Sequence, residues 1–249
     1  MPIKHSAWQH RGVQQRLPSL LDPPIGFAHR GARAHASENT LEAFALALRL
    51  GATGLESDVW LTADNVAVLD HDGVVRRWGR KQPIRQLTLQ SLPSHIPTLG
   101  SMLSHCVEDF HLSLDVKDPL ALTATLAAIR EVRPHLEEKL WLCHPNWEQV
   151  AQWRNLTHAK LVDSTRLSRI KEGPERRAAS LHDTGIDAIN MHHTDWNGGL
   201  VTLFHRFNKY ALGWDMQQEH VISDGLRMGL DGIFSDHTDR MMDAFSRHV

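Results

Sequence analysis

The sequence predicts an α/β protein, a (β/α)₈ TIM barrel with a short cap loop after the second strand. Short apolar runs, typical of buried strands, alternate with segments whose apolar residues recur every three or four positions, as on one face of a helix. Eight such strand–helix units occupy about 225 residues, or about 28 residues each, which is typical of this barrel. The alternative is a doubly wound open sheet. No glycine-rich phosphate loop follows the first strand, so the nucleotide-binding form of that alternative is not supported.

The elements are expected in a regular order along the chain. Predicted strands cover residues 25–28, 54–59, 110–116, 139–143, 160–162, 187–191, 209–213 and 231–234. The first helix carries its apolar face on Leu41, Phe44 and Leu48. Asn39 is predicted as its N-cap, because Glu42 follows three residues later as in a capping box, and Gly51 is predicted to end it. We therefore expect one barrel domain over residues 25–249.

Residues 1–24 precede the first predicted strand and form a predicted N-terminal extension. Pro23 and Pro24 mark its end. The extension is expected to cover the bottom of the barrel, where the amino ends of the strands lie.

Composition excludes several classes of protein. Lys and Arg number 27 against 29 Asp and Glu, a net charge of −2, so neither a nucleic-acid partner nor a polybasic one is expected. The longest apolar stretch, residues 41–50, is broken by Glu42 and Arg49 and falls far short of the roughly 20 residues of a membrane span. With 41% hydrophobic and 22% charged residues, the chain is expected to be a soluble globular protein.

The amino terminus lacks the continuous apolar segment of a secretory signal. Cys106 and Cys143, the two cysteines, stand in apolar surroundings, which favours reduced thiols over a disulfide. Together these features predict a cytoplasmic location.

Ionisable residues concentrate at the carboxyl ends of the early strands, where barrel chemistry is expected. Alternate residues of a strand share a face, so Glu56 should project with Asp58, and Asp115 with Lys117. The residues that share this position are His29 and Arg30, Glu56 and Asp58, His71, and Asp115 and Lys117.

Three carboxylates that converge in a barrel mouth need a hard cation between them, because buried like charges repel one another. Oxygen ligands select a divalent cation such as Mg²⁺ or Ca²⁺. The alternative is that Glu56 or Asp115 forms only an ion pair with Arg30 or Lys117. The shared parity of the two pairs favours the metal site, with Glu56, Asp58 and Asp115 as its ligands.

Residues 29–72 carry a dense series of motifs, HRGARAHASENTLEAFALALRLGATGLESDVWLTADNVAVLDHD. This string strongly resembles the signature of the glycerophosphodiester phosphodiesterase family, in which the motifs histidine-arginine-glycine, proline-glutamate-asparagine-threonine, glutamate-x-aspartate and histidine-aspartate follow one another. The resemblance continues more thinly through residues 96–99 and 115–117, Trp214 and residues 232–236. It implies a (β/α)₈ barrel.

The resemblance also implies a role for each matching residue. In this family two histidines act as general acid and base, three carboxylates bind the metal, two cations bind the phosphate, and an aromatic residue lines the substrate mouth. These positions match, in the same order, His29 and His71; Glu56, Asp58 and Asp115; Arg30 and Lys117; and Trp214.

Two residues depart from the family pattern. Ser37 stands where the family usually has proline, and Asp115 stands where it usually has glutamate. The shorter Asp115 is expected to reach the cation through a water or to draw it toward its own strand. Sphingomyelinase D-type relatives also have an aspartate there, which leaves the substrate class open.

The predicted cap between the histidine-aspartate motif and the next helix spans only residues 73–96. Its basic run surrounds Trp78 and contains Arg76, Arg77, Arg80, Lys81 and Arg85. This basic run is expected either to attract an anionic headgroup or to make weak contact with a membrane surface. The alternative, which is favoured, is that it is a solvated loop.

Three further histidines follow later strands. His192 and His193 follow the sixth strand, but adjacent residues on a strand diverge, so a second metal site there is not favoured over a role in lining the mouth. His144 ends the fourth strand and receives no assigned role.

The predicted function is hydrolysis of a small-molecule glycerophosphodiester to glycerol phosphate and an alcohol. One histidine would deprotonate the nucleophile and the other would protonate the leaving oxygen, while the cations neutralise the phosphate. Asp72 is expected to orient His71. The alternatives are a lipid phosphodiesterase of the lysophospholipase D or sphingomyelinase D kind, suggested by Asp115 and the short cap, and a non-catalytic phosphodiester-binding barrel.

Overall fold

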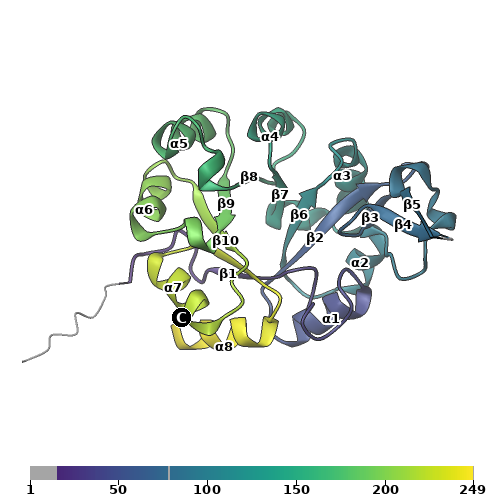
Figure 1. The fold of residues 1–249 in the computed structure, drawn as a ribbon, viewed down its shortest axis with the longest axis horizontal. Coiled ribbons are helices and arrows are strands. Elements are labelled where there is room, and N and C mark those ends of the chain that lie inside the picture. Colours follow the sequence, from purple (N-terminus) through teal and green to yellow (C-terminus); the bar gives the residue numbers. More distant parts are fainter. Residues whose placement is uncertain (1–15, 78, 249) are drawn as a thin grey trace, which may run out of the picture.

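The computed structural model describes residues 16–77 and 79–248, which fold around a closed barrel of eight parallel strands (Figure 1). The strands are β1 (Ile25–Ala28), β2 (Gly54–Leu61), β6 (His111–Val116), β7 (Leu140–His144), β8 (Lys160–Thr165), β9 (Ala188–His192), β10 (Tyr210–Trp214) and β11 (Gly232–Ser235). β1 closes the barrel because it pairs with β11, Ile25 opposite Gly232, and with β2, Phe27 opposite Gly54. The predicted TIM barrel is confirmed, with strand boundaries that differ by a few residues.

Helices surround the strands on the outside (Figure 1). They are α1 (Leu41–Arg49), α2 (Leu99–His105), α3 (Ala121–Val132), α4 (Trp147–Gln152), α5 (Pro174–Asp183), α6 (Gly198–Arg206), α7 (Glu219–Met228) and α8 (Thr238–His248). Short 3₁₀ turns are η1 (Ile84–Gln86), η2 (Leu89–Ser91), η3 (Pro134–Lys139), η4 (Trp153–Asn155), η5 (Leu167–Arg169) and η6 (His193–Asp195). Each helix buries its apolar face, as Ala43, Phe44 and Ala47 show in α1.

A separate apolar cluster fills the barrel interior. Phe27, Trp141, Val162, Leu212 and Phe234 come from five different strands and are at most 4% exposed. The rings of Phe27 and Phe234 stack with centroids 4.5 Å apart. This layer supports the polar side chains that follow it toward the carboxyl ends of the strands.

The cap of α1 differs from the prediction. Thr40 is the N-cap, with an extended backbone and a side chain that accepts a hydrogen bond from the Ala43 N–H. Asn39 has φ 55°, a left-handed conformation that an N-cap does not adopt, and its Oδ1 accepts a hydrogen bond from the Ser57 hydroxyl at 2.7 Å. Asn39 therefore ties the loop to β2 instead of capping the helix.

The predicted short cap, residues 73–96, is an insertion that contains a β-hairpin and the 3₁₀ turns η1 and η2. β3 (Ala67–Leu69) runs antiparallel to β2, and β4 (Val74–Arg77) pairs with β5 (Arg80–Pro83) in a hairpin at the edge of the molecule (Figure 1). Gly73 begins the insertion with φ 67°, and a Cβ there would lie 2.4 Å from the Trp60 ring, so only glycine fits. Trp78 lies outside the described residues.

The described part of the N-terminal extension, residues 16–24, contacts the amino end of β11. The Leu17 N–H donates to the Arg227 carbonyl, and the Ser19 hydroxyl donates to Oδ1 of Asp231 at 2.7 Å. Leu21 packs against the apolar cluster inside the barrel. These contacts lie at the bottom of the barrel, and residues 1–15 of the predicted extension lie outside the described part.

Within the described part of the chain, no helix has both the length and the apolar character that a membrane crossing requires. Cys106 and Cys143 are both buried and free.

Candidate active site

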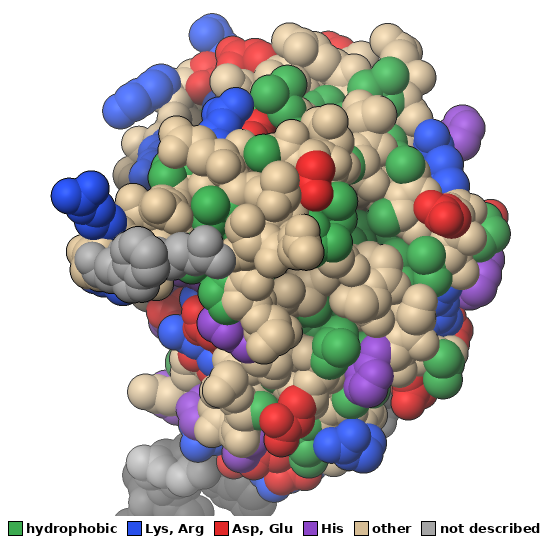
Figure 2. Space-filling model, turned by 90° about the vertical axis from the view of Figure 1, so that its right-hand side faces the viewer, with side chains coloured by type: hydrophobic (Ala, Val, Ile, Leu, Met, Phe, Trp, Pro, Cys, Tyr) green, Lys and Arg blue, Asp and Glu red, His purple; other side chains and the backbone are tan. Residues whose placement is uncertain are grey.

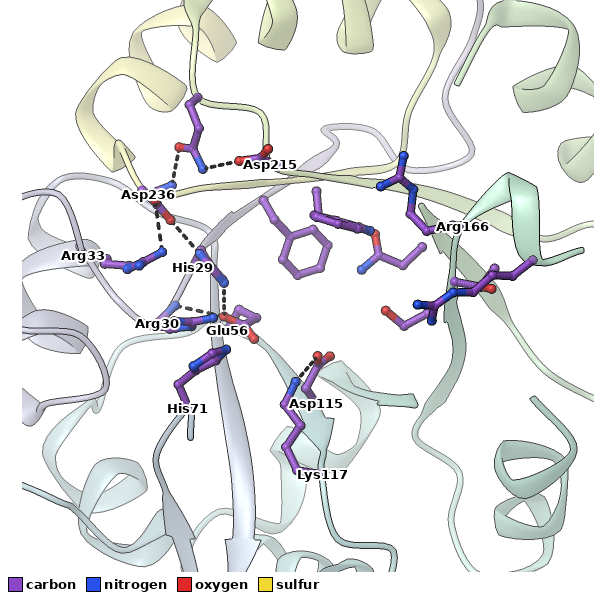
Figure 3. A pocket seen from close by; sticks show the side chains of 17 residues that line it. His29, Arg30, Arg33, Glu56, His71, Asp115, Lys117, Arg166, Asp215 and Asp236 are labelled. Carbon is purple, nitrogen blue, oxygen red and sulfur yellow. Dashed lines mark hydrogen bonds and ion pairs between the residues drawn. The ribbon is translucent and has the colours of Figure 1, made fainter. Parts of the chain in front are cut away.

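A polar pocket of about 510 Å³ opens at the carboxyl ends of the strands (Figure 3). Charged side chains of both signs and histidines also gather in a hollow at the left edge of the space-filling view (Figure 2). Seven of the eight predicted site residues line the pocket, namely His29, Arg30, Glu56, His71, Asp115, Lys117 and Trp214. The eighth, Asp58, is not among the lining residues and is 2% exposed.

The three predicted metal ligands converge. Glu56 and Asp58 lie on β2, and Asp115 lies opposite Asp58 on β6, so all three project to the same side of the sheet. One carboxylate oxygen from each lies within 4.8 Å of the others. Burial, with the charges of Asp58 and Asp115, raises the pKa of Glu56 to about 8, although His29 opposes the shift. Burial is the largest of these causes, so ionisation of Glu56 is disfavoured until a positive charge approaches it.

The donor set fits a hard divalent cation. All three ligands offer oxygen only, the chemistry that Mg²⁺ and Ca²⁺ prefer. Oδ2 of Asp58 is buried and accepts no hydrogen bond from any described residue, and the ion pair found for it there is with Nε of Arg30 at 3.4 Å. A buried carboxylate oxygen with this lack of donors is a suitable ligand atom.

Lys117 also contacts this cluster. Its ammonium lies 2.9 Å from Oδ1 of Asp58 and 3.0 Å from Oδ2 of Asp115. Burial lowers the pKa of Lys117, but the two neighbouring carboxylates outweigh that effect and hold the pKa above its usual value. Lys117 is therefore a fixed positive charge on the pocket wall. Its ion pair with Asp115 is one of those expected under the alternative to a metal site.

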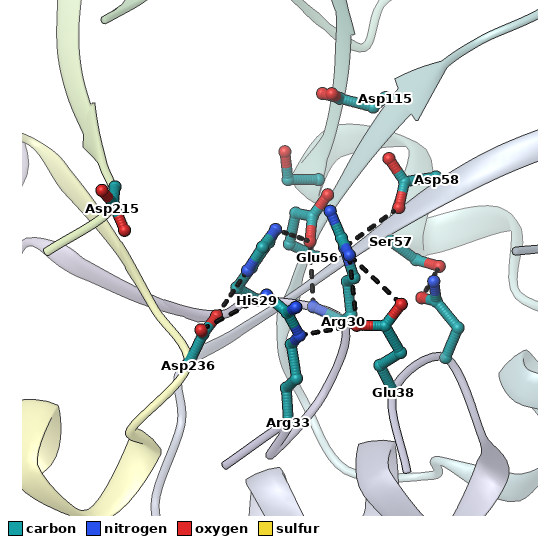
Figure 4. Close-up of polar contacts among 12 residues, drawn as sticks. His29, Arg30, Arg33, Glu38, Glu56, Ser57, Asp58, Asp115, Asp215 and Asp236 are labelled. Carbon is teal, nitrogen blue, oxygen red and sulfur yellow. Dashed lines mark hydrogen bonds and ion pairs between the residues drawn. The ribbon is translucent and has the colours of Figure 1, made fainter. Parts of the chain in front are cut away.

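Arg30 is held by an unusual local backbone. Its φ is 54°, and its N–H donates to Oε2 of Glu56 at 2.9 Å (Figure 4). The guanidinium contacts Glu38 at 3.1 Å and Asp58 at 3.4 Å. The next residue, Gly31, has φ 80°, and a Cβ there would lie 2.7 Å from the backbone of Ala43. The turn of the histidine-arginine-glycine motif thus places the Arg30 guanidinium in the pocket, and this turn requires glycine at position 31.

His29 lies between two carboxylates. Its Nδ1 is 2.6 Å from Oδ1 of Asp236, and its Nε2 is 3.8 Å from Oε2 of Glu56 (Figure 4). Burial lowers the pKa of His29, but the charge of Glu56 and the hydrogen bond with Asp236 raise it above its usual value. Because Nδ1 is occupied, Nε2 is the nitrogen that faces the site.

His71 follows β3 and reaches the same pocket. Its Nδ1 is 2.8 Å from Oδ1 of Asp72, the contact expected from the sequence, and its side chain is 41% exposed. In Figure 3, His29 and His71 lie on either side of Glu56 and Arg30 in the view. Each imidazole therefore has one nitrogen held by an aspartate and the other available to the pocket.

The opposite wall of the pocket comes from β8, β9 and β10. Trp214 lines it, and the Arg166 guanidinium carbon lies 5.7 Å from the centre of the Trp214 ring. Of the residues of this wall, sequence reasoning selected Trp214 and missed the others. The additional lining residues with polar side chains include Ser164, Arg166, Arg169, Asn190, Asp215 and, beside His29, Arg33 and Asp236.

Asp236 follows β11 directly, so the same rule that selected His29 at the end of β1 would have selected it. Arg166 follows β8 and Arg169 ends the 3₁₀ turn η5, and an arginine in such a connection carries no comparable sequence signal. Their position in the pocket depends on the fold.

The expectation that His192 and His193 diverge is wrong. Their ring centroids lie 4.4 Å apart, and ligand atoms of both residues and of Asp215 lie within 4.8 Å of one another. The reason is that His192 ends β9 whereas His193 begins the 3₁₀ turn η6, so strand alternation no longer applies. Neither histidine, nor His144, lines the described pocket, although His192 packs against Trp214 at 4.6 Å.

Solved structures with this fold resemble the chain closely. A glycerophosphodiester phosphodiesterase of Thermotoga maritima matches with a TM-score of 0.76 and 21% identity, covering 88% of this chain and 97% of that one. A phosphodiesterase of Oleispira antarctica, solved with the product sn-glycerol-3-phosphate, matches with a TM-score of 0.79 and 20% identity, covering 90% of this chain and 97% of that one.

Sequence comparison identifies the family. The glycerophosphodiester phosphodiesterase of Caldanaerobacter subterraneus subsp. tengcongensis is 24% identical over 245 residues, which cover 86% of this chain and 95% of that protein. The model of the glycerophosphoryl diester phosphodiesterase family matches residues 29–240, nearly the whole barrel. The chain therefore belongs to the glycerophosphoryl diester phosphodiesterase family of phosphoric diester hydrolases.

Proposed function

We propose that the protein is a metal-dependent phosphodiesterase that hydrolyses glycerophosphodiesters to glycerol phosphate and an alcohol by two-histidine acid–base catalysis. The observation that carries this proposal is the convergence of three carboxylates, two cations and two aspartate-held imidazoles in one pocket. Family membership supports the reaction class, and the product bound to the Oleispira antarctica phosphodiesterase supports the substrate class.

Glu56, Asp58 and Asp115 would hold the divalent cation, Mg²⁺ or Ca²⁺. When bound, such a cation neutralises charge on the phosphate and polarises its oxygens. The cation would also offset the burial and the carboxylate repulsion that together raise the pKa of Glu56. Because Asp115 is 30% exposed whereas Glu56 and Asp58 are buried, it is the ligand on the open side of the cluster.

Arg30 and Lys117 would bind the non-bridging phosphate oxygens. A phosphodiester gains negative charge on these oxygens in the transition state, so fixed cations there stabilise it more than the ground state. Both side chains are already held by carboxylates, and little ordering remains to be done when substrate binds.

His29 and His71 would move the two protons. One imidazole accepts the proton of the nucleophile, the nucleophile oxygen bonds to phosphorus, the bond to the alcohol oxygen breaks, and the other imidazole protonates that oxygen. The nucleophile is either water or a substrate hydroxyl beside the phosphate. Asp236 and Asp72 hold the Nδ1 atoms, which leaves both Nε2 atoms for proton transfer.

A lysophospholipase D or sphingomyelinase D-like activity is the second candidate. Among the described residues of the insertion over 73–96, none lines the pocket, so the mouth is open on that side. The β4–β5 hairpin instead presents exposed Arg76, Arg80 and Lys81, which would permit weak contact with an anionic membrane surface. An open mouth and Asp115 favour a bulky lipid substrate, and Trp214 would provide an apolar wall for it.

Nucleic acid is not a proposed partner, because the net charge is −2. A cytoplasmic location remains our proposal, since both cysteines are buried and free.

A product assay on purified, chelated protein tests the proposal. Release of glycerol phosphate from glycerophosphocholine after addition of Mg²⁺ or Ca²⁺ would support it, and faster turnover of lysophosphatidylcholine would favour the lipid candidate. Glu56→Gln should be impaired, while Glu42→Gln, at an exposed position of α1, should match the wild type. Binding of glycerophosphocholine without turnover under any metal condition would instead indicate a non-catalytic barrel.

A further inference from the structure

The half of the pocket across from the carboxylate cluster has no part in the proposed chemistry. It lies on or after β8, β9 and β10, and its side chains include those of Ser164, Arg166, Arg169, Asn190, Trp214 and Asp215. Asp215 is the one carboxylate among these side chains, and it pairs with Nε2 of His192 at 3.1 Å. Figure 3 shows Arg166 on the far side of the pocket from Glu56 and Lys117. We propose that this half is a subsite for the alcohol substituent of the diester, and that it selects a hydroxylated alcohol that bears a second anionic group.

Arg166 is fixed in place as a cation. Its Nε lies 2.5 Å and its Nη2 3.3 Å from the two carboxylate oxygens of Asp195, a bidentate pair, and Asp195 also accepts from the Leu167 N–H at 3.1 Å. The same guanidinium lies over Trp214, 5.7 Å from the ring centre. A quaternary ammonium such as choline binds best to an uncovered aromatic face, and here a cation already holds that place. The wall therefore disfavours a cationic alcohol.

Arg169 offers a second and uncommitted positive charge. It ends the turn η5, its side chain is exposed, and it lines the pocket. Among the described residues, its guanidinium has no carboxylate partner, in contrast to Arg30, Arg33 and Arg166. A guanidinium with free donors binds a carboxylate or phosphate in bidentate geometry.

Asn190 indicates that the substituent also carries hydroxyl groups. It lines the pocket and is 5% exposed, yet its Oδ1 is buried and accepts no hydrogen bond from any described residue. An unpaired buried amide oxygen is costly, so a donor is expected to approach it when the pocket is filled. The Ser164 side chain lines the same wall, and a hydroxyl of the substrate is the donor that fits both.

These features together describe the substrate class. A polyol would satisfy Asn190, and an anion attached to it would pair with Arg169 beside the fixed charge of Arg166. Choline and ethanolamine meet neither requirement. The inference rests on the proposed phosphodiesterase function, because it assigns the carboxylate half of the pocket to the scissile phosphate.

Matched substrates test the anionic part of the inference. Glycerophosphoserine differs from glycerophosphoethanolamine by one carboxylate, and the wild-type enzyme should prefer the serine diester in kcat/KM by roughly tenfold, the worth of one partly exposed charge-assisted contact. Arg169→Ala should remove most of that preference and leave the ethanolamine diester little changed. Arg176→Ala, at an exposed position on α5 outside the pocket, is the matched control and should keep the preference.

A second pair tests the hydroxyl part. Glycerophosphoglycerol should be cleaved faster than glycerophosphopropanol, which lacks the head-group hydroxyls, and Asn190→Leu should reduce that difference. The proportion of folded protein is checked by thermal unfolding, so a folding defect is not mistaken for lost recognition.

The possible outcomes are distinct. If Arg169→Ala slowed the serine and ethanolamine diesters equally, the arginine would serve the scissile phosphate and the subsite would be wrong. No charge preference in the wild type, with normal turnover, would overturn the inference while leaving the proposed function intact. If no diester were cleaved, the proposed function would fall, and calorimetry of glycerophosphoserine binding to wild type and Arg169→Ala would still decide whether the subsite exists.

Discussion

Nδ1 of His29 lies 2.6 Å from Oδ1 of Asp236, a contact that joins the carboxyl ends of the first and last barrel strands. It orients the imidazole so that Nε2 faces Glu56 at 3.8 Å. Burial raises the pKa of Asp236, but the hydrogen bond with His29 and the nearby positive charges lower it below its usual value. Asp236 therefore stays charged and stabilises the protonated imidazole.

Asp236→Asn should lower turnover by about 10²-fold, the lower end of the range for an acid–base group, because the imidazole loses its orienting charge. The hydrogen bond and charge of Asp236 raise the pKa of His29, so the variant's His29 should titrate at a lower pH. The limb of the pH–rate profile that reports this histidine should move in that direction. Asp239→Asn, on the nearby surface, should leave the profile unchanged, and an unshifted profile in Asp236→Asn would contradict the assigned role.

Glu56→Gln should weaken the metal site rather than abolish it, because an amide oxygen still coordinates but brings no charge. Activity of the variant should fall at low metal concentration and recover in part as Mg²⁺ or Ca²⁺ is raised. The wild type should also gain thermal stability on metal addition, since a ligand that binds only the folded state stabilises it. Full activity of the wild type after exhaustive chelation would rule out the metal site.

His29→Ala and His71→Ala should each lose roughly 10²- to 10⁴-fold in turnover yet remain folded. A substrate whose leaving group needs no proton should rescue only the variant that lacks the general acid, which assigns the two roles. His158→Ala, outside the pocket, is the control and should behave as the wild type. Wild-type turnover in His71→Ala would show that the acid–base pair is assigned wrongly.

The fold could be predicted from the sequence because strand and helix periodicities are local signals that repeat eight times. The convergence of Glu56, Asp58 and Asp115 followed from strand alternation and from the rule that barrel sites lie at carboxyl ends. Both inferences use only the direction in which a strand side chain points.

Features that depend on loop conformation were not predictable in the same way. Asn39 satisfies the composition of a capping box, but its left-handed backbone and its bond with Ser57 depend on β2, which follows later in the chain. The contact of Arg166, which follows β8, with Trp214, the last residue of β10, joins residues that are 48 positions apart in the numbering. No periodic pattern reports such long-range pairs.

A buried ion pair outside the active site offers a test of stability. Asp163 and Arg177 lie 2.6 Å apart with side chains that are 0% and 7% exposed. Asp163→Ala should lower the free energy of unfolding by about 3 kcal/mol, because it removes the hydrogen-bond acceptor altogether and, among the described residues, leaves Arg177 with Glu172 as its carboxylate partner. The double variant Asp163→Leu/Arg177→Met should recover most of this loss, since apolar residues need no desolvated charge.

The same pair predicts a dependence on pH. Burial raises the pKa of Asp163 from its usual 3.8 to about 6, although Arg177 opposes the shift. The folded state therefore binds a proton at Asp163 more tightly than the unfolded state does. The free energy of unfolding of the wild type should fall as the pH rises from about 4 to about 6, because Asp163 of the folded protein loses this proton over that range. Urea unfolding should show the double variant gaining stability relative to the wild type over that range, and a constant difference would contradict the assignment.

The exposed Arg130 provides the control for the buried pair. Arg130→Met removes its ion pair with Glu137 and should lower the free energy of unfolding by less than about 1 kcal/mol.

The basic β4–β5 hairpin provides the last prediction. Arg76, Arg80 and Lys81 are exposed and line no part of the pocket. Their charges should therefore affect a substrate through the anionic vesicle surface that carries it, not through direct contact. Reversing all three to Glu should raise the apparent KM for lysophosphatidylcholine in anionic vesicles by roughly 100-fold, because each basic residue near such a surface contributes about 1 kcal/mol to binding. Soluble glycerophosphocholine should be little affected.

Salt separates the electrostatic origin of this effect from a structural one. Exposed charges are screened beyond about 8 Å at physiological ionic strength, so the difference between wild type and hairpin variant should shrink as salt is added. A matched reversal of Arg49, Arg176 and Arg206, exposed on other elements, should change vesicle kinetics far less. Equal loss on both substrates would mean that the hairpin serves the phosphate site, and no loss on either would show that its charges are merely solvated.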